Sequence, residues 1–256
     1  MKKHFSVFML MARFAFWPAL LVSLGASAAM FVCMLFFGER ADELYLNRPS
    51  DDFFFPARIV LYVGLVLLVL LVVLLMRSMR ERGGVQPGYT LRRLGVSEFA
   101  AFAWQGLAAA LAVFVYFAFA AAALFGYALC YQAQGLGEAG NLSALVMLYG
   151  SRTAHALMPL ADAAVYVRMA MFCLAIGLGC SYSSMLSRHG KRFSATPFVV
   201  VALALVFLPA AVGEGVAELL LVLGALAVIT FIIAGARLRR YDGEDEEEGT
   251  ADGEAV

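Results

Sequence analysis

Six long runs of apolar residues, almost free of charged side chains, dominate this chain of 256 residues. A helix needs about 20 apolar residues to cross the hydrocarbon core of a bilayer. Hydrophobic residues make up 63% of the chain and charged residues 15%, compared with about 45–50% and about 25% in soluble domains. We therefore predict an all-α integral membrane protein with six transmembrane helices in one domain, residues 1–240. The expected spans are about 14–37, 58–76, 106–131, 163–186, 194–212 and 216–236.

The positions of lysine and arginine predict how these helices are oriented. Basic residues in short loops remain on the cytoplasmic side of a membrane. With six spans, fourteen of the nineteen basic residues lie before the first span, between the second and third, between the fourth and fifth, or after the sixth. Five or seven spans would scatter these charges over both sides. We therefore expect both termini in the cytoplasm and a multi-pass protein of the plasma membrane, which is the inner membrane in a bacterium.

The third apolar run, residues 99–137, is too long for one helix perpendicular to the membrane. At a rise of about 1.5 Å per residue it would far exceed the hydrocarbon thickness. We expect residues 97–106 to lie in the cytoplasmic interface, with Trp104 at the level of the lipid headgroups. The span itself would then cover 107–131, a segment rich in alanine, and small residues let neighbouring membrane helices approach closely.

The second outer loop, residues 132–162, contains two recognisable patterns. Its start, Gly135–Gly140, fits a GxGxxG dinucleotide motif, but no strand precedes it, so we interpret it as a flexible turn. The residues from Leu142 to about Leu157 predict a short amphipathic helix that ends before Pro159. This loop is therefore expected to hold structure on the outer surface and no nucleotide.

Motifs that carry catalysis are missing from the sequence. It contains no GxxxxGK[ST] phosphate loop, no HExxH and no GxSxG. Its four cysteines form no CxxC pair and have no neighbouring histidine, so we interpret them as small buried hydrophobes. They are Cys33, Cys130, Cys173 and Cys180. We expect no enzyme activity, no metal and no cofactor on this chain, and a net charge of zero gives no indication of a nucleic-acid partner.

Arg168 is the charged residue that the sequence places inside an expected span. Ionisable residues within membrane spans are costly and usually face the protein interior or a water-filled cavity. Asp162 is one candidate partner, although a separation of six residues puts the two on different faces of a straight helix. Glu214 and Glu218, four residues apart near the last span, are the other candidates. Both a substrate or gating role and a structural ion pair remain open for these four residues.

The segment between the second and third spans, residues 77–105, is strongly basic. It starts with arginines, continues through a turn of glycine and proline, and ends in a short amphipathic element. Leu91 and Leu94 are three residues apart, with Arg92 and Arg93 beside them. Taken alone, the pattern is typical of an interfacial helix whose arginines contact anionic lipid.

This segment resembles the corresponding segment of the permeases of type-2 ABC transporters. These permeases have six spans with both ends cytoplasmic, and their loop between spans two and three carries an acidic residue, glycines and a Thr-Leu…Leu-x-Val-Ser stretch. The matching residues here are Glu81, Gly83, Thr90, Leu91, Leu94, Val96 and Ser97. Gly95 departs from the pattern, because proline is frequent at that position in the family, and this puts the local geometry in doubt.

The resemblance implies a coupling helix that inserts into a cleft on a separate ATPase subunit, which would bind the ATP and Mg²⁺. It also implies a second permease chain, identical or related. The residues expected to contact the ATPase are Glu81, Tyr89, Thr90, Leu91, Arg92, Arg93, Leu94, Gly95, Val96, Ser97 and Glu98. Outer loops of only about 18 and 30 residues favour an exporter of an amphipathic or antimicrobial molecule, because they leave little room to receive cargo from a binding protein.

Two other functional classes stay open. The chain could be the six-span substrate-binding component of a vitamin-type uptake system, which would hold a small ligand without an ATPase. It could also be a membrane enzyme acting on lipid or peptide, which the missing catalytic motifs disfavour. The last residues, 241–256, include eight acidic and no basic side chains, and we expect this tail to be disordered and solvated, or else to dock on a partner.

Overall fold

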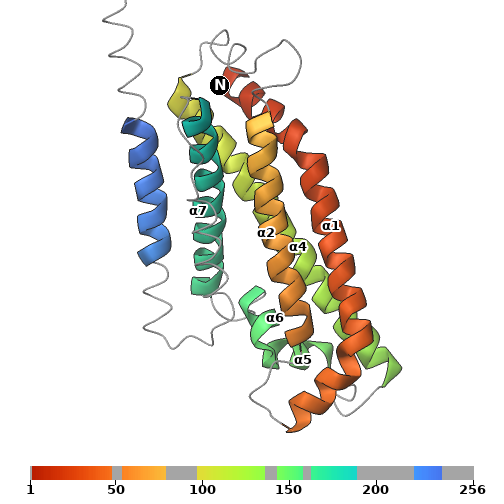
Figure 1. The fold of residues 1–256 in the computed structure, drawn as a ribbon. Helices are drawn as coiled ribbons and strands as arrows, with labels where there is room; N and C mark the ends of the chain where they lie inside the picture. Colours follow the sequence, from red (N-terminus) through yellow and green to blue (C-terminus); the bar gives the residue numbers. More distant parts are fainter. Residues whose placement is uncertain are drawn as a thin grey trace, which may run out of the picture.

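The structure is a computed structural model that describes residues 2–47, 54–78, 97–135, 143–157, 163–188 and 222–237. Within these ranges all regular structure is helical and no strand occurs, which confirms the all-α prediction for this part of the chain. The helices are α1 (Lys2–Asn47), α2 (Phe55–Ser78), α4 (Glu98–Gln134), α5 (Ala144–Gly150), α6 (Arg152–Leu157) and α7 (Ala163–Arg188), followed by an unlabelled helix, Val222–Arg237 (Figure 1).

Four of the described helices are long and apolar enough to cross a bilayer. Their apolar stretches are Ala15–Gly38, Pro56–Met76, Glu98–Gln134 and Val165–Ser187. They fall where the sequence predicts the first four spans. The helix Val222–Arg237 is apolar as well but shorter, and it lies within the predicted sixth span. The predicted fifth span, 194–212, lies outside the described residues, as does the acidic tail.

Helices α1 and α4 run in the same direction. Near their starts the ring centroids of Phe8 and Trp104 are 5.7 Å apart, and further along those of Phe31 and Tyr127 are 6.1 Å apart. Figure 1 shows α4 passing obliquely behind α2, from the side of α7 toward the far end of α1. Because α4 contacts α1, α2 and α7, it is the helix around which the bundle is organised.

Helices α2 and α7 run in the opposite direction to α1 and α4. The thiol of Cys33, late in α1, lies 3.6 Å from the carbonyl oxygen of Pro56, at the start of α2. The hydroxyl of Ser184 lies 3.4 Å from the carbonyl oxygen of Met76, and both residues are near the ends of their helices. The first, second, third and fourth predicted spans therefore alternate in direction.

The helix Val222–Arg237 runs parallel to α7. A Cβ built on Gly224 would lie 3.4 Å from the Cβ of Met171, and the rings of Phe231 and Tyr182 are 6.0 Å apart. The residue numbers therefore increase together along both helices. The N-terminus of the chain, the ends of α2 and α7, the start of α4 and Arg237 all lie at one end of the bundle, which we call the basic end (Figure 1).

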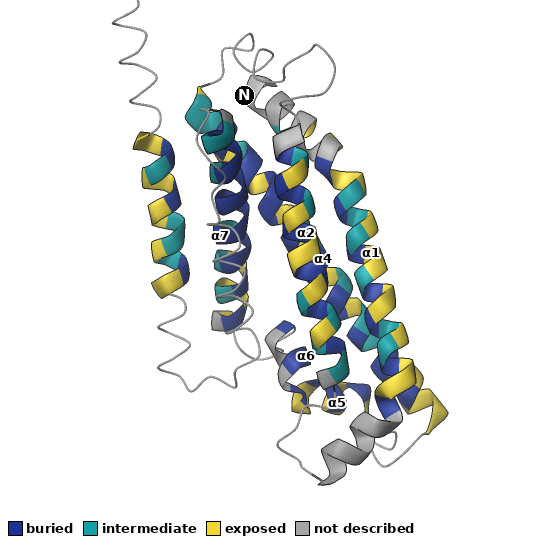
Figure 2. Ribbon diagram, viewed as in Figure 1, coloured by how far each residue is buried: buried dark blue, intermediate teal, exposed yellow. Residues whose placement is uncertain are grey.

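The helices of the bundle differ in how far their side chains are exposed. The outward faces of α1 and α2 expose large apolar side chains, whereas α7 is buried along most of its length (Figure 2). Trp17, Leu21 and Phe36 of α1 are examples of exposed residues. Such a surface is unfavourable in water and favourable in contact with lipid chains.

The segment 97–106 was expected at the cytoplasmic interface, and that position stays a prediction. In the structure it opens α4, which is one continuous helix from Glu98 to Gln134, and Ala101, Phe102 and Gly106 are buried in it. One expected local feature is wrong. The single amphipathic helix expected over 142–157 is instead two short helices, α5 and α6, because the backbone of Ser151 is extended between them.

Candidate functional site

The candidate site is the basic end of the bundle, where α2 ends and α4 begins on either side of residues 79–96. Those residues lie outside the described part of the chain, so the structure does not place most of the predicted coupling residues. The unplaced residues are Glu81, Tyr89, Thr90, Leu91, Arg92, Arg93, Leu94, Gly95 and Val96. Of the predicted set, only Ser97 and Glu98 are described.

Ser97 is the N-cap of α4. Its hydroxyl accepts a hydrogen bond from the backbone N–H of Ala100 at 3.3 Å, and its carbonyl accepts from the N–H of Ala101 at 3.0 Å. The first N–H groups of a helix lack partners within the helix, and a serine at this position satisfies one of them. Glu98 follows as the first helical residue, where its negative charge is favoured by the helix dipole. The structure therefore gives both residues a role in starting α4.

Three hydroxyl groups near the end of α7 lie inside the bundle. Ser181, Ser183 and Ser184 are all buried. The Ser181 hydroxyl donates to the carbonyl of Phe102 in α4 at 2.8 Å, and the Ser184 hydroxyl donates to the carbonyl of Met76 in α2 at 3.4 Å. In lipid, such polar side chains bond across helices because no water is available. The end of α7 is thus bonded to both helices that flank residues 79–96.

Glycines let α4 and α7 cross closely just below these serines. A Cβ on Gly177 would clash with the carbonyl oxygen of Gly106 and would lie 2.6 Å from the backbone nitrogen of Ala110. A Cβ on Gly106 would lie 2.6 Å from Cδ2 of Leu178. Gly177 therefore cannot carry a side chain without moving backbone atoms, whereas at Gly106 the nearest atom is the end of the Leu178 side chain. This contact agrees with the expectation that small residues in the third span allow close approach.

The helix Val222–Arg237 covers the same region from the other side. A Cβ on Gly235 would lie 2.9 Å from the ring of Phe102, and Phe231 packs against Tyr182. Arg237 at the end of this helix and Arg13 of α1 are exposed. The basic end therefore combines a closely packed interior with exposed cations at its edge.

The predicted intramembrane polar residues are only partly placed. Arg168 lies in α7, is half-buried and has an interaction partner. Asp162, Glu214 and Glu218 lie outside the described residues, so the two proposed pairings stay predictions.

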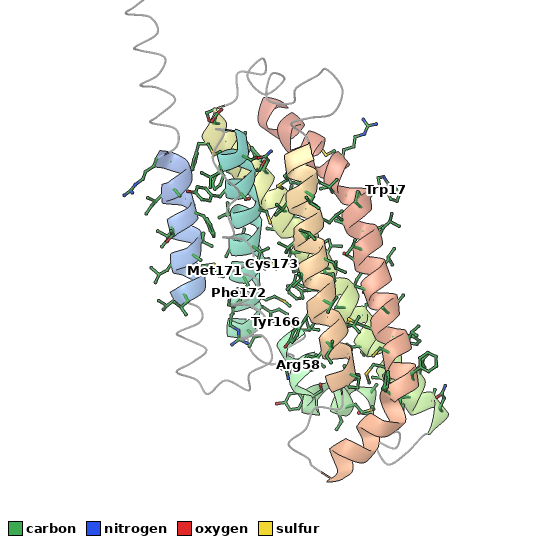
Figure 3. All side chains as sticks on the ribbon, viewed as in Figure 1. Trp17, Arg58, Tyr166, Met171, Phe172 and Cys173 are labelled. Atoms are coloured by element: carbon green, nitrogen blue, oxygen red, sulfur yellow. The ribbon has the colours of Figure 1, made fainter. Side chains whose placement is uncertain are left out.

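Arg58 is a second cation that the bundle brings into a span. Its Nε donates to the hydroxyl of Tyr62 at 2.7 Å, and its guanidinium carbon lies 5.6 Å from the centroid of the same ring. Figure 3 shows Arg58 at the start of α2, at the end of the bundle opposite to the basic end. A cation at the edge of a span is stabilised by such a contact with an aromatic ring. The spacing of four residues in the sequence is the signal that points to it.

Serine is uncharged, so it does not interrupt a charge-free apolar run. Ser181 and Ser184 are therefore not predicted as site residues from the sequence. Their spacing of three residues on one helix, close to the end of a span, is the available signal. Which helices they bond follows only from the packing of α2, α4 and α7.

The cysteines differ in their surroundings. Cys173 and Cys180 are buried as predicted, Cys33 is half-buried, and all four are free. The prediction of a buried residue is wrong for Cys130, which is exposed on α4 in the part of the chain that the structure describes. Among the described residues, no three side chains of His, Cys, Asp or Glu come together as metal ligands.

Together, the apolar spans, the exposed apolar faces and the interhelical hydroxyl bonds define a multi-pass helical membrane protein. In comparisons with known proteins, no family model, no curated protein and no solved structure matches this chain.

Proposed function

We propose that this chain is the membrane-spanning permease subunit of an ATP-driven ABC transporter, and that ATP hydrolysis takes place on a separate partner subunit. The observation that carries the proposal is the position of the two helix ends that flank the basic segment 79–96. The end of α2 and the start of α4 both lie at the basic end of the bundle, on the same side as the start of α1 and the end of the last helix. A partner ATPase in the cytoplasm could reach this segment only if the basic end is cytoplasmic.

The direction of the helices supports six spans with both termini in the cytoplasm. Because α7 and the helix Val222–Arg237 run parallel, positions 189–221 connect opposite ends of the bundle. That stretch includes the charge-free run Phe193–Gly213, which is long enough for one span. Fourteen of nineteen basic residues then adjoin the basic end, and such an excess is typical of the cytoplasmic side. The membrane would be the plasma membrane, or the inner membrane of a bacterium.

The opposite end favours export over uptake through a binding protein. The described part of the second outer loop forms two short helices, α5 and α6, which pack against α4. The side-chain oxygen of Gln132 accepts from the N–H of Ala144 at 3.0 Å, and Met147 and Leu148 are buried. The described part of this loop is therefore held against the bundle and forms no separate receptor domain, although Leu145, Val146 and Tyr149 remain exposed. We propose an amphipathic or antimicrobial molecule as cargo and a second permease chain as partner.

The proposal is tested by exchanging Leu91→Asp and Leu94→Asp together in the tagged full-length chain. If these leucines insert into a cleft of the ATPase, two charges there prevent binding, because burying an unpaired carboxylate is costly. The matched control is Thr250→Asp with Ala251→Asp, which adds the same two charges to the acidic tail. Both variants are solubilised in mild detergent and assayed for the co-purified ATPase.

We expect the control to retain the ATPase and the leucine variant to lose it, while both keep the same elution volume and the same melting temperature. Retention of the ATPase by the leucine variant would contradict a coupling helix in this segment. If the unaltered chain instead purifies with a stoichiometric small molecule and no ATPase, that result would favour the substrate-binding component of an uptake system.

A further inference from the structure

Residues 79–96 are held at both of their attachment points by the same helix, α7. At the first point the Ser184 hydroxyl bonds the carbonyl of Met76, two residues before α2 ends at Ser78. At the second point the Ser181 hydroxyl bonds the carbonyl of Phe102, five residues after Ser97. One short stretch of α7 thus bridges the exit from α2 and the entry into α4.

The bond to Met76 satisfies a group that α2 cannot satisfy itself. The last four carbonyls of a helix have no N–H partner within the helix, and Met76 is among the last four residues of α2. A buried carbonyl without a partner is costly in lipid. Ser184 therefore acts as a cap supplied by a neighbouring helix. At 3.4 Å this bond is longer than usual for two oxygens, so we expect it to be the weaker of the two.

The bond to Phe102 lies where α4 is packed most closely. Gly106 and Gly177 bring the backbones of α4 and α7 together, and Gly235 of the last helix packs against the ring of Phe102. The Ser181 bond is 2.8 Å long and fully buried. The start of α4 is therefore fixed to α7 more firmly than the end of α2.

We propose that Ser181 and Ser184 are positioning residues that hold the two attachment points of residues 79–96 at a fixed spacing on α7. A displacement of either attachment point is then passed to α7, because neither the end of α2 nor the start of α4 can move without breaking a bond to α7. That a bound ATPase moves α7 through these two bonds rests on the proposed function. The positioning itself concerns only the bonds within this chain.

The direct test is hydrogen–deuterium exchange on the purified full-length chain in lipid nanodiscs, without any partner. The variants are Ser181→Ala, Ser184→Ala and both together. Each interhelical bond of this kind changes a local opening equilibrium about three-fold. We therefore expect about three-fold faster exchange of amides near the start of α4 in S181A, a smaller increase near the end of α2 in S184A, and both local increases together in the double variant.

Thr230→Ala is the control. Its hydroxyl bonds the carbonyl of Leu226 within the last helix at 2.7 Å. We expect T230A to leave exchange near the end of α2 and the start of α4 unchanged. Ser184→Thr keeps a hydroxyl at this position. It should restore the slow exchange of the unaltered chain near the end of α2. A general loss of stability would raise exchange along all helices and would not be rescued in this way.

Unchanged exchange at both attachment points in the double variant, or an equal increase in T230A, would overturn the positioning role. Co-purification of the ATPase with the unaltered chain is scored separately. Its failure would remove the proposed function but leave the exchange result in place, because exchange is measured on the chain alone.

Discussion

The hydroxyl of Tyr116 in α4 donates a hydrogen bond of 2.6 Å to the backbone carbonyl of Leu61 in α2. Gly64, one turn further along α2, makes room for it, because a Cβ there would clash with the same hydroxyl. Tyr116 is fully buried, so the bond has no competing water. It fixes the register of α2 against α4 in the middle of the bundle.

Tyr116→Phe should therefore lower the stability of the bundle by about 0.6 kcal/mol, and by no more than about 1.7 kcal/mol, the range for hydrogen bonds between membrane helices. The measurement is thermal unfolding of the purified chain in detergent. Tyr166→Phe is the control, because Tyr166 of α7 is half-exposed. Equal melting temperatures for Y116F and the unaltered chain would contradict this role of the bond.

Because α4 and α7 cross closely, adding a single methyl group at the crossing should lower the stability of the bundle strongly. Gly177→Ala should destabilise the bundle by about 1–3 kcal/mol, the usual cost of overpacking, because the new Cβ would meet backbone atoms of Gly106 and Ala110. Gly126→Ala is the matched control, since nothing lies within 4 Å of a Cβ there. It should be neutral or stabilising by about 0.5–1 kcal/mol, because alanine is the better helix former.

Melting temperatures of the two glycine variants in the same detergent decide between these outcomes. Equal melting temperatures of G177A and G126A would contradict the close approach of α4 and α7.

The parallel course of α7 and the helix Val222–Arg237 predicts a specific cross-link. With the native cysteines replaced, Met171→Cys and Gly224→Cys should form a disulfide, because their Cβ atoms would be 3.4 Å apart, close to the separation that a disulfide requires. The control pair, Met171→Cys with Gly235→Cys, would be brought together only if the last helix ran antiparallel. Mobility shifts on non-reducing gels of membranes treated with a mild oxidant report both pairs. A cross-link in the control pair alone would rule out the parallel arrangement.

The proposed orientation, with the basic end in the cytoplasm, predicts which exposed positions react from outside the cell. In a chain without native cysteines, Tyr149→Cys in α5 should be labelled by a membrane-impermeant maleimide in intact cells. Arg13→Cys and Arg237→Cys, at the basic end, should be labelled only after the membrane is opened. All three side chains are exposed, so a difference in labelling reports sidedness. Labelling of Arg237→Cys in intact cells would place the basic end outside.

The four spans that the structure describes could be predicted because they depend on one property, the length of charge-free apolar runs. Val165–Ser187 could still be found even though it contains Arg168. The packing at the start of α4 could not be predicted, because Phe102 and Gly106 contact α7 and the last helix. These partners are distant in sequence, and no local pattern encodes the contact.

The candidate site was predictable only in its location. The basic pattern of residues 77–105 points to the end of the bundle that joins α2 to α4, and the hydroxyl at Ser97 is a recognisable helix start. The roles of Ser181 and Ser184 depend on which carbonyls lie opposite them, and that is a property of three packed helices. The break at Ser151 between α5 and α6 is likewise set by its extended backbone and not by the apolar pattern.

The most direct test of the central claim is purification of the tagged, unaltered chain from its native membranes under mild conditions, followed by identification of the bound proteins and an assay of ATP hydrolysis. We predict a stoichiometric partner that carries a GxxxxGK[ST] phosphate loop and hydrolyses ATP in the complex. Recovery of the chain without any ATP-hydrolysing protein, under conditions that preserve its fold, would contradict the account.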